Sequence, residues 1–126
     1  MCYTQNRFKA LLSACVMLLI ATAGWSQSLT WLGTLGGNRS EAFGVSADGA
    51  VVVGYAQNAA GRARAFRWTA AGGMEDLNTT YASLLTNGSE LQSASAISPD
   101  GRYIVGKGWN AATRRYEAFL LDTGPR

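Results

Sequence analysis

The stretch GVSADGAVVVG at residues 44–54 returns as AISPDGRYIVG at residues 96–106, an offset of 52 residues. The match continues to Phe66 in the first copy and, after one inserted residue, to Phe119 in the second. Self-similarity at a fixed offset is the sequence signature of a repeated structural unit. The sequence therefore predicts two copies of one unit.

A tight turn stands at the centre of each copy. In the second copy proline presets φ at the second turn position, aspartate suits the third, and glycine accepts the left-handed conformation that follows. The first copy has Ala47 in place of the proline and keeps the aspartate and the glycine. A type I turn followed by a left-handed residue closes a three-residue β-hairpin. We therefore expect structural turns at Asp48, Gly49, Pro99, Asp100 and Gly101.

The residues on both sides of the turns are typical of β-strands. The triplets at residues 51–53 and 103–105 are β-branched or aromatic, and their unbroken apolar character predicts strands covered on both faces. Gly54 and Gly106 then interrupt these strands, which indicates a bulge or a close backbone approach. A loop and a further strand follow in each copy, so each copy predicts three antiparallel strands. A fourth strand is expected at residues 29–32.

This strand pattern decides the predicted fold class. Three or four antiparallel strands per copy are typical of a β-propeller blade or a similar meander. We therefore predict an all-β domain at residues 24–126, an incomplete β-propeller of two blade-like repeats. Repeat 1 is expected at about residues 29–76 and repeat 2 at about residues 90–123.

The segment between the repeats has a different pattern. Three leucines and Tyr81 recur with helical spacing within residues 77–86. This spacing predicts a short helix at about residues 77–86. Asn78 or Thr79 is expected to cap the helix, and Asn87-Gly88 is expected to end it.

The N-terminus differs from the rest of the chain. A segment with Arg7 and Lys9 precedes the uncharged run ALLSACVMLLIATA, which ends in small residues. This order predicts a secretory signal peptide at residues 1–23, cleaved after Ala23 or near Gln27. The predicted location is then the periplasm, the cell surface or the extracellular medium. A transmembrane span needs about 20 apolar residues, more than this run provides.

A lipid anchor is the alternative interpretation of the same segment. Leu12-Ser13-Ala14-Cys15 matches the motif that precedes the acylated cysteine of bacterial lipoproteins. Such a cysteine normally ends the apolar run, whereas here the run continues to Ile20. We therefore favour the signal peptide and predict no membrane association after its removal.

Removal of the leader also changes the chemistry that the chain offers. Cys2 and Cys15 leave with it, and the whole chain has no histidine, so no disulfide, thiol nucleophile or usual transition-metal site is predicted. Without Arg7 and Lys9, nine basic residues face eight acidic ones. This balance gives no case for nucleic acid as a partner. The sequence predicts no cofactor, no metal and no enzymatic activity.

A set of arginines near two tryptophans is the candidate interaction surface. Arginines interleaved with aromatic residues bind acidic glycans or protein patches in other proteins. The alternative is a solvated strand face that guards a sheet edge, with one tryptophan in the core. The candidate residues are Arg62, Arg64, Arg67, Trp68, Trp109, Arg114 and Arg115.

The whole repeat region resembles a known family. LGTLGGNRSEAFGVSADGAVVVGYAQNAAGRARAFRWTAAGGMEDLN, residues 32–78, closely resembles the units of the bacterial "extracellular repeat, HAF family". The His-Ala-Phe triplet of that family is Arg64-Ala65-Phe66 in the first copy and Glu117-Ala118-Phe119 in the second, so both histidines are replaced. The resemblance implies an exported protein of propeller-like repeats with no assigned activity.

Two function hypotheses follow. The first is a non-enzymatic exported protein with a structural or interaction role outside the cell, and the alternative is a module that binds a carbohydrate or protein ligand. A propeller closes with about 4–8 blades, so two copies leave open sheet edges. Self-association through these edges, a small sandwich and a truncated remnant of a longer repeat protein all remain open.

Overall fold

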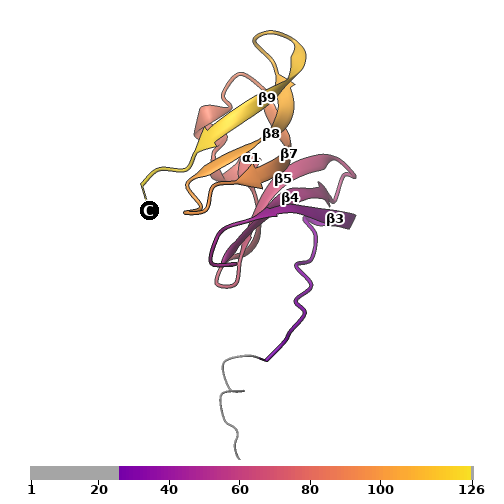
Figure 1. Ribbon diagram of the computed structural model, residues 1–126. Coiled ribbons are helices and arrows are strands. Elements are labelled where there is room, and N and C mark those ends of the chain that lie inside the picture. The colour runs from indigo at the N-terminus through magenta and orange to yellow at the C-terminus, as the bar shows by residue number, and fades with distance from the viewer. Residues whose placement is uncertain (1–25, 126) are drawn as a thin grey trace, which may run out of the picture. The chain divides into compact units, whose positions relative to one another are not determined.

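The computed structural model describes residues 26–125 (Figure 1). The predicted signal peptide at residues 1–23 lies outside the described residues, and so does the lipid-anchor alternative at Cys15. Residues 26–31 belong to a separate unit and contain no helix or strand. Residues 32–125 carry the β-structure.

The repeat region consists of two antiparallel sheets, and the predicted all-β class is confirmed. Figure 1 shows β7 between β8 and the first sheet. The first sheet has the strand order β3 (Gly36–Val45), β4 (Val51–Asn58), β5 (Ala63–Thr69), β6 (Gly73–Asp76), and the second has β7 (Glu90–Ile97), β8 (Tyr103–Asn110), β9 (Arg115–Asp122).

The strand registers of the two sheets agree at equivalent residues. Ala42 of β3 pairs with Gly54 of β4, and Ala94 of β7 pairs with Gly106 of β8. A register shift follows each of these pairs. A Cβ atom on Gly54 would collide with a carbonyl oxygen of β3, and one on Gly106 with a carbonyl oxygen of β7. The predicted close backbone approach at both glycines is therefore confirmed.

Both predicted hairpin turns are present with the expected geometry. The amide of Gly49 donates to the carbonyl oxygen of Ser46 at 3.0 Å, and the amide of Gly101 donates to that of Ser98 at 2.9 Å. The φ angles of the two glycines are +75° and +82°, in the left-handed region where a side chain is strained. The sequence signal for these turns was sufficient because each residue type has one steric role in them.

Serine and aspartate side chains brace the turns. The Ser98 hydroxyl donates to Asp100 at 2.7 Å and accepts from the amide of Tyr103 at 2.9 Å. The hydrogen bond from Ser98 is the main reason that the pKa of Asp100 is lowered. The first copy repeats the contact, with the Ser46 hydroxyl donating to Asp48 at 2.8 Å. These aspartates serve as turn braces.

The fourth strand of the first sheet is not where the sequence suggested. Residues 29–32 form no strand, and the fourth strand is β6, which pairs with the C-terminal half of β5. The turn before β6 contains Gly72, and Gly73 has a φ of +70° that few other residues tolerate. A tight hairpin therefore forms after β5 and supplies the fourth strand of this sheet.

The predicted connector helix at residues 77–86 is wrong in length and in its cap. One α-turn, α1 (Leu77–Thr80), is followed by a 3₁₀ turn, η2 (Ala82–Leu84). Asp76 caps α1, since its carboxylate accepts from the amide of Asn78 at 2.8 Å. The Asn78 side chain instead holds β7, donating to the Leu91 carbonyl oxygen at 2.8 Å and accepting from its amide at 2.7 Å. Because asparagine and threonine have low helix propensity, the helix does not extend.

The two sheets contact each other through β7, which crosses β3, β4 and β5. Gly44 of β3 permits the close approach, because a Cβ atom there would lie 3.0 Å from the Cα atom of Ala96. The two hairpin turns also meet, since the amide of Ala47 donates to the Pro99 carbonyl oxygen at 2.9 Å. The buried cluster between the sheets consists of Val53, Ala65, Leu77, Leu91, Ala94, Ile104 and Leu121.

Alternation along β8 and β9 leaves one face of the second sheet turned away from this cluster. We call it the outer face; its residues are Tyr103, Val105, Lys107, Trp109, Tyr116, Ala118, Leu120 and Asp122. The prediction that both apolar triplets are covered on both faces is therefore wrong for residues 103–105. Tyr103 and Val105 are exposed, because no other segment of residues 26–125 covers them.

Candidate functional site

A charged and aromatic cluster lies where the start of β7 meets the hairpin between β4 and β5. Glu90 pairs with Trp109 across β7 and β8, and Trp109 pairs with Tyr116 across β8 and β9. The three side chains are therefore neighbours across the second sheet. Arg62 and Arg64 reach them from the first sheet. We call these five residues the Glu90 site.

Two arginines share the carboxylate of Glu90. One Nη atom of Arg62 donates to both oxygens of Glu90 at 3.0 and 2.9 Å, and an Nη atom of Arg64 lies 3.4 Å from one of them. Arg62 is mostly exposed, so its pair contributes at most about 1 kcal/mol. Arg64 is largely buried, and its Nε atom has no hydrogen-bond partner in the described part of the chain. The site therefore fixes charge at a defined place on the surface.

The aromatic half of the site is open to solvent. The rings of Trp109 and Tyr116 meet edge to face, with centroids 5.0 Å apart. A hollow of about 310 Å³ is bordered by this aromatic pair, Arg62, Glu90 and Gln92. Aromatic faces beside charged hydrogen-bonding groups can bind a flat, polar ligand.

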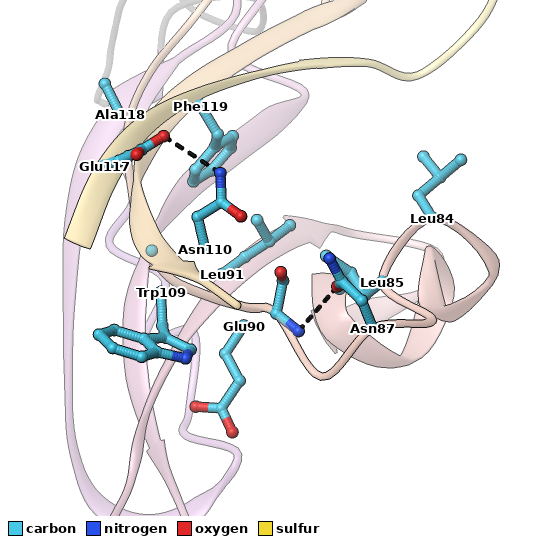
Figure 2. A pocket seen from close by; sticks show the side chains of 12 residues that line it. Leu84, Leu85, Asn87, Glu90, Leu91, Trp109, Asn110, Glu117, Ala118 and Phe119 are labelled. Atoms are coloured by element: carbon cyan, nitrogen blue, oxygen red, sulfur yellow. Dashed lines mark hydrogen bonds between the residues drawn. The ribbon is translucent and has the colours of Figure 1, made fainter. Parts of the chain in front are cut away.

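A second hollow of about 280 Å³ lies between the connector and the β8–β9 hairpin (Figure 2). Leu84 and Leu85 form one wall, and Asn110 and Glu117 lie on the other, with Asn110 donating to Glu117 at 3.1 Å. Phe119 also lines this hollow, on the side of Asn110 and Glu117, and packs against the buried cluster. This hollow combines apolar walls with one carboxylate.

The carboxylate of Glu117 is held in its ionised form. The Thr113 hydroxyl donates to it at 2.7 Å, Arg115 at 3.0 Å and Asn110 at 3.1 Å. These hydrogen bonds, that of Thr113 first, lower the pKa of Glu117. An ionised carboxylate that already accepts three hydrogen bonds is poorly suited to give a proton to a substrate. Its role is to fix the β8–β9 loop.

Arg67 and Trp68 do not join the Glu90 site. Arg67 donates to Glu75 at 2.7 Å and stacks over Tyr81, with its guanidinium carbon 5.5 Å from the ring centroid. Burial alone would raise the pKa of Glu75, but hydrogen bonds from Arg67 and Thr80 and the charge of Arg67 lower it. The pair therefore supports the core. Trp68 follows Arg67 in β5 and therefore lies on the other face of the first sheet from Arg67.

Arg114 and Arg115 lie in and beside the loop between β8 and β9. Arg115 forms an ion pair with Glu117 at 2.9 Å. Arg114 has a φ of +59°, a left-handed conformation that is uncommon for a residue with a side chain. Of the seven candidate residues, the structure brings together Arg62, Arg64 and Trp109.

The sequence analysis missed Glu90 and Tyr116. Tyr116 had a detectable signal, because the short β8–β9 loop fixes the hairpin register that places it opposite Trp109. Glu90 had no such signal in the sequence. Arg62 lies 28 residues earlier in the chain, and both arginine partners of Glu90 come from the region of the first sheet. Contacts between sheets depend on how β7 crosses β5, which no local pattern encodes.

The described residues contain neither a metal-binding cluster nor a membrane-spanning helix. Residues 26–125 hold no group of three or more histidine, cysteine, aspartate or glutamate side chains arranged to bind a metal ion. Among the same residues, no helix has the length and apolar character needed to cross a membrane.

Comparison with known proteins adds no relative from which a function could be transferred. No protein-family model, no curated protein and no solved structure matches this chain.

Proposed function

We propose that this chain is an exported, non-enzymatic β-repeat protein that binds a macromolecular partner through the outer face of its second sheet. The resemblance to the HAF family supports both export and a propeller-like arrangement of the two sheets. In this proposal each sheet is one blade-like unit, and the cluster around Val53 and Ile104 is the contact between consecutive units.

The exposed apolar outer face is the observation that carries the proposal. Val105 and Leu120 pair across β8 and β9 in the middle of this face, with Tyr103 and Tyr116 on either side. All four are exposed. Tyr103, Val105 and Leu120 are adjacent on this face, and Lys107 and Ala118 separate them from Tyr116. An exposed apolar surface of this kind indicates an interaction site.

The carboxylates of the described residues also favour binding over catalysis. Glu75, Glu90 and Asp122 form ion pairs with arginines at 2.7–2.9 Å. Asp48 and Asp100 brace hairpin turns. Each of these side chains therefore has a structural task that accounts for its presence.

Export is tested by expressing the full chain in a bacterium with a C-terminal affinity tag. We expect the tagged protein outside the cytoplasm, and mass spectrometry of the intact protein to place its first residue at Gly24 or near Gln27. Recovery from the cytoplasm with residues 1–23 still attached contradicts export.

Binding through the outer face is tested with the exported chain on intact cells of the same culture. Leu120→Asp places a charge in the outer face and is expected to reduce the amount of chain retained on cells several-fold. Leu84→Asp is the matched control, because Leu84 is equally exposed but lies on η2. Equal retention of both variants contradicts binding through this face.

A carbohydrate ligand at the Glu90 site is the second candidate. The half-buried Trp109 and the exposed Tyr116 beside the Arg62–Glu90 ion pair favour it, because sugars stack on aromatic rings and hydrogen-bond to charged groups. A glycan array probed with the exported chain tests this candidate. Specific hits that Trp109→Ala abolishes support it, and an array without hits removes it.

A further inference from the structure

We infer that the partner of the outer face is a second copy of this chain, docked head to tail, with its β3 strand on that face. The inference rests on the proposed binding role of the outer face and names its partner. It follows from a comparison of residues that the sequence repeat makes equivalent. In such pairs, one member is buried between the sheets and the other is exposed.

The surface that β7 covers on the first sheet has an equivalent on the second sheet, and the equivalent surface is uncovered. Val53 is 0% exposed, whereas its equivalent Val105 is 41% exposed. Val51 is 2% exposed, whereas its equivalent Tyr103 is 38% exposed. Ala65 is fully buried and its equivalent Ala118 is exposed. In the first sheet, β7 crosses this surface; in the second sheet, no segment of residues 26–125 does.

The strand that packs on this surface also has an equivalent. β7 packs on the first sheet, whereas the equivalent residues of β3 are exposed. On β7, Ala94 is fully buried and Ile97 packs against the cluster. On β3, the equivalents Ala42 and Val45 are exposed, Val45 to 56%. The chain therefore presents a free docking strand in its first copy and a free receiving face in its second.

Charge complementarity supports the same pairing. Inside the chain, Ser93 of β7 and Tyr55 of β4 line one hollow between the sheets. Their equivalents are Glu41 of β3 and Lys107 of β8. In a head-to-tail contact, Glu41 of one chain and Lys107 of the next therefore lie near each other with opposite charges. Such a pair favours this orientation over others.

One contact of the internal interface is absent from the intermolecular one. Within the chain, the amide of Ala47 donates to the Pro99 carbonyl oxygen. The equivalent donor in the next contact would be the nitrogen of Pro99, which carries no hydrogen. The intermolecular contact is therefore weaker than the internal one, and we expect association that increases with concentration.

A contact between unlike surfaces has a specific consequence. A two-fold dimer uses the same surface on both partners, whereas a head-to-tail contact uses two different surfaces. Damage to either surface therefore stops assembly, but two differently damaged chains still share one intact contact. This property separates the inference from symmetric association and from pairing of sheet edges.

The test measures molar mass by light scattering after size exclusion, on the exported full chain at increasing concentration. We expect assembly of the unaltered chain and of Leu84→Asp, and monomers for both Val45→Asp and Leu120→Asp. An equal mixture of Val45→Asp and Leu120→Asp is expected to form dimers and nothing larger. Circular dichroism of each variant establishes that it is folded, and Lys107→Glu with Glu41→Lys provides a second pair if one does not fold.

In that second pair, each charge reversal alone weakens assembly and the double variant in one chain restores it. Monomers of the unaltered chain at every concentration overturn the inference, and so does a mixture that stays monomeric. If the unaltered chain is monomeric and Leu120→Asp still lowers retention on cells, the inference fails and the proposed binding role stands. If the unaltered chain is monomeric and Leu120→Asp leaves retention on cells unchanged, both the inference and the proposed binding role fail.

Discussion

Val53 and Val105 occupy matching places in two hairpins with the same turn, the same bulge and the same register, yet one is buried and the other is exposed. The local sequence accounts for the hairpin in both cases. The difference comes from β7, which covers the first sheet and belongs to the second. The burial of these equivalent residues is therefore decided by what packs against each sheet and not by the hairpin itself.

The largest expected effect tests what the two copies share. Gly54→Ala and Gly106→Ala each place a methyl group into the backbone of the paired strand, so the bulge must rearrange. We expect each to lower the free energy of unfolding by about 3 kcal/mol or more, measured by urea denaturation. Gly61→Ala is a milder reference, because open space surrounds its Cβ position. A loss below that of the reference would show that the close approach is not needed.

The next effect tests what separates the copies. Val53→Ala removes two methyl groups from the core, and we expect it to lower the free energy of unfolding by about 2 kcal/mol. Val105→Ala, measured at a concentration where the chain is monomeric, should change it by less than about 0.5 kcal/mol. Equal losses at the two positions would mean that the outer face is covered in solution even in the monomer.

A smaller effect concerns the loops between the second and third strands of each copy. Arg114 adopts the left-handed conformation that Gly61 adopts at the equivalent place in the first copy. Because a side chain costs about 1 kcal/mol in this conformation, Arg114→Gly is expected to raise the free energy of unfolding by roughly that amount. Urea denaturation measures the change, and a destabilised variant would show that the Arg114 side chain makes a compensating contact.

The smallest effect is the pH dependence of one ion pair that the first copy lacks at the equivalent positions. Arg102 donates to Asp122 at 2.8 Å. The pKa of Asp122 is lowered from 3.8 to about 2, and this hydrogen bond is the largest cause. The equivalents in the first copy, Ala50 and Thr69, form no such pair. Since the folded state holds the lower pKa, the contribution is present above pH 3.8 and is lost as the pH falls through about 2.

Asp122→Asn should therefore lower the melting temperature slightly at neutral pH and leave it unchanged near pH 2. Thermal melts of both proteins across this range measure the difference. The Arg67–Glu75 pair is a background contribution of the same sign, because the pKa of Glu75 is also lowered. A difference between the two proteins that is constant with pH would exclude the ion pair as its cause.

The predictable part of this fold is local. Turn residues, β-branched triplets and interrupting glycines each have one steric role, so both hairpins and the all-β class followed from residue types alone. The connector was misjudged because leucine spacing suggested a helix, while the low helix propensity of Asn78 and Thr79 and the Asn78 contacts with β7 limit it to one turn.

The unpredictable part depends on contacts between distant segments. The equivalent apolar triplets at residues 51–53 and 103–105 suggested equal burial, but burial depends on which strand crosses which sheet. For the same reason, Arg62 and Trp109 were candidates while their shared neighbour Glu90 was not. No charged residue stands next to Glu90 in the sequence. The crossing of β7 over β5 brings it to the arginines.

The crossing by β7 also sets an order of events during synthesis. Every strand, β7 included, pairs only with neighbours in sequence, so the first sheet has all its strands once residue 76 has emerged. Its apolar surface at Val51 and Val53 stays exposed until β7, which begins at residue 90, has been synthesised and packs on it. For that interval the nascent chain shows the same kind of surface that the finished chain retains on its outer face. In the head-to-tail contact that we infer, β3 of a completed chain can therefore dock on a nascent chain before the nascent chain has made its own β7. The length of chain between residues 76 and 90 sets how long this competition lasts.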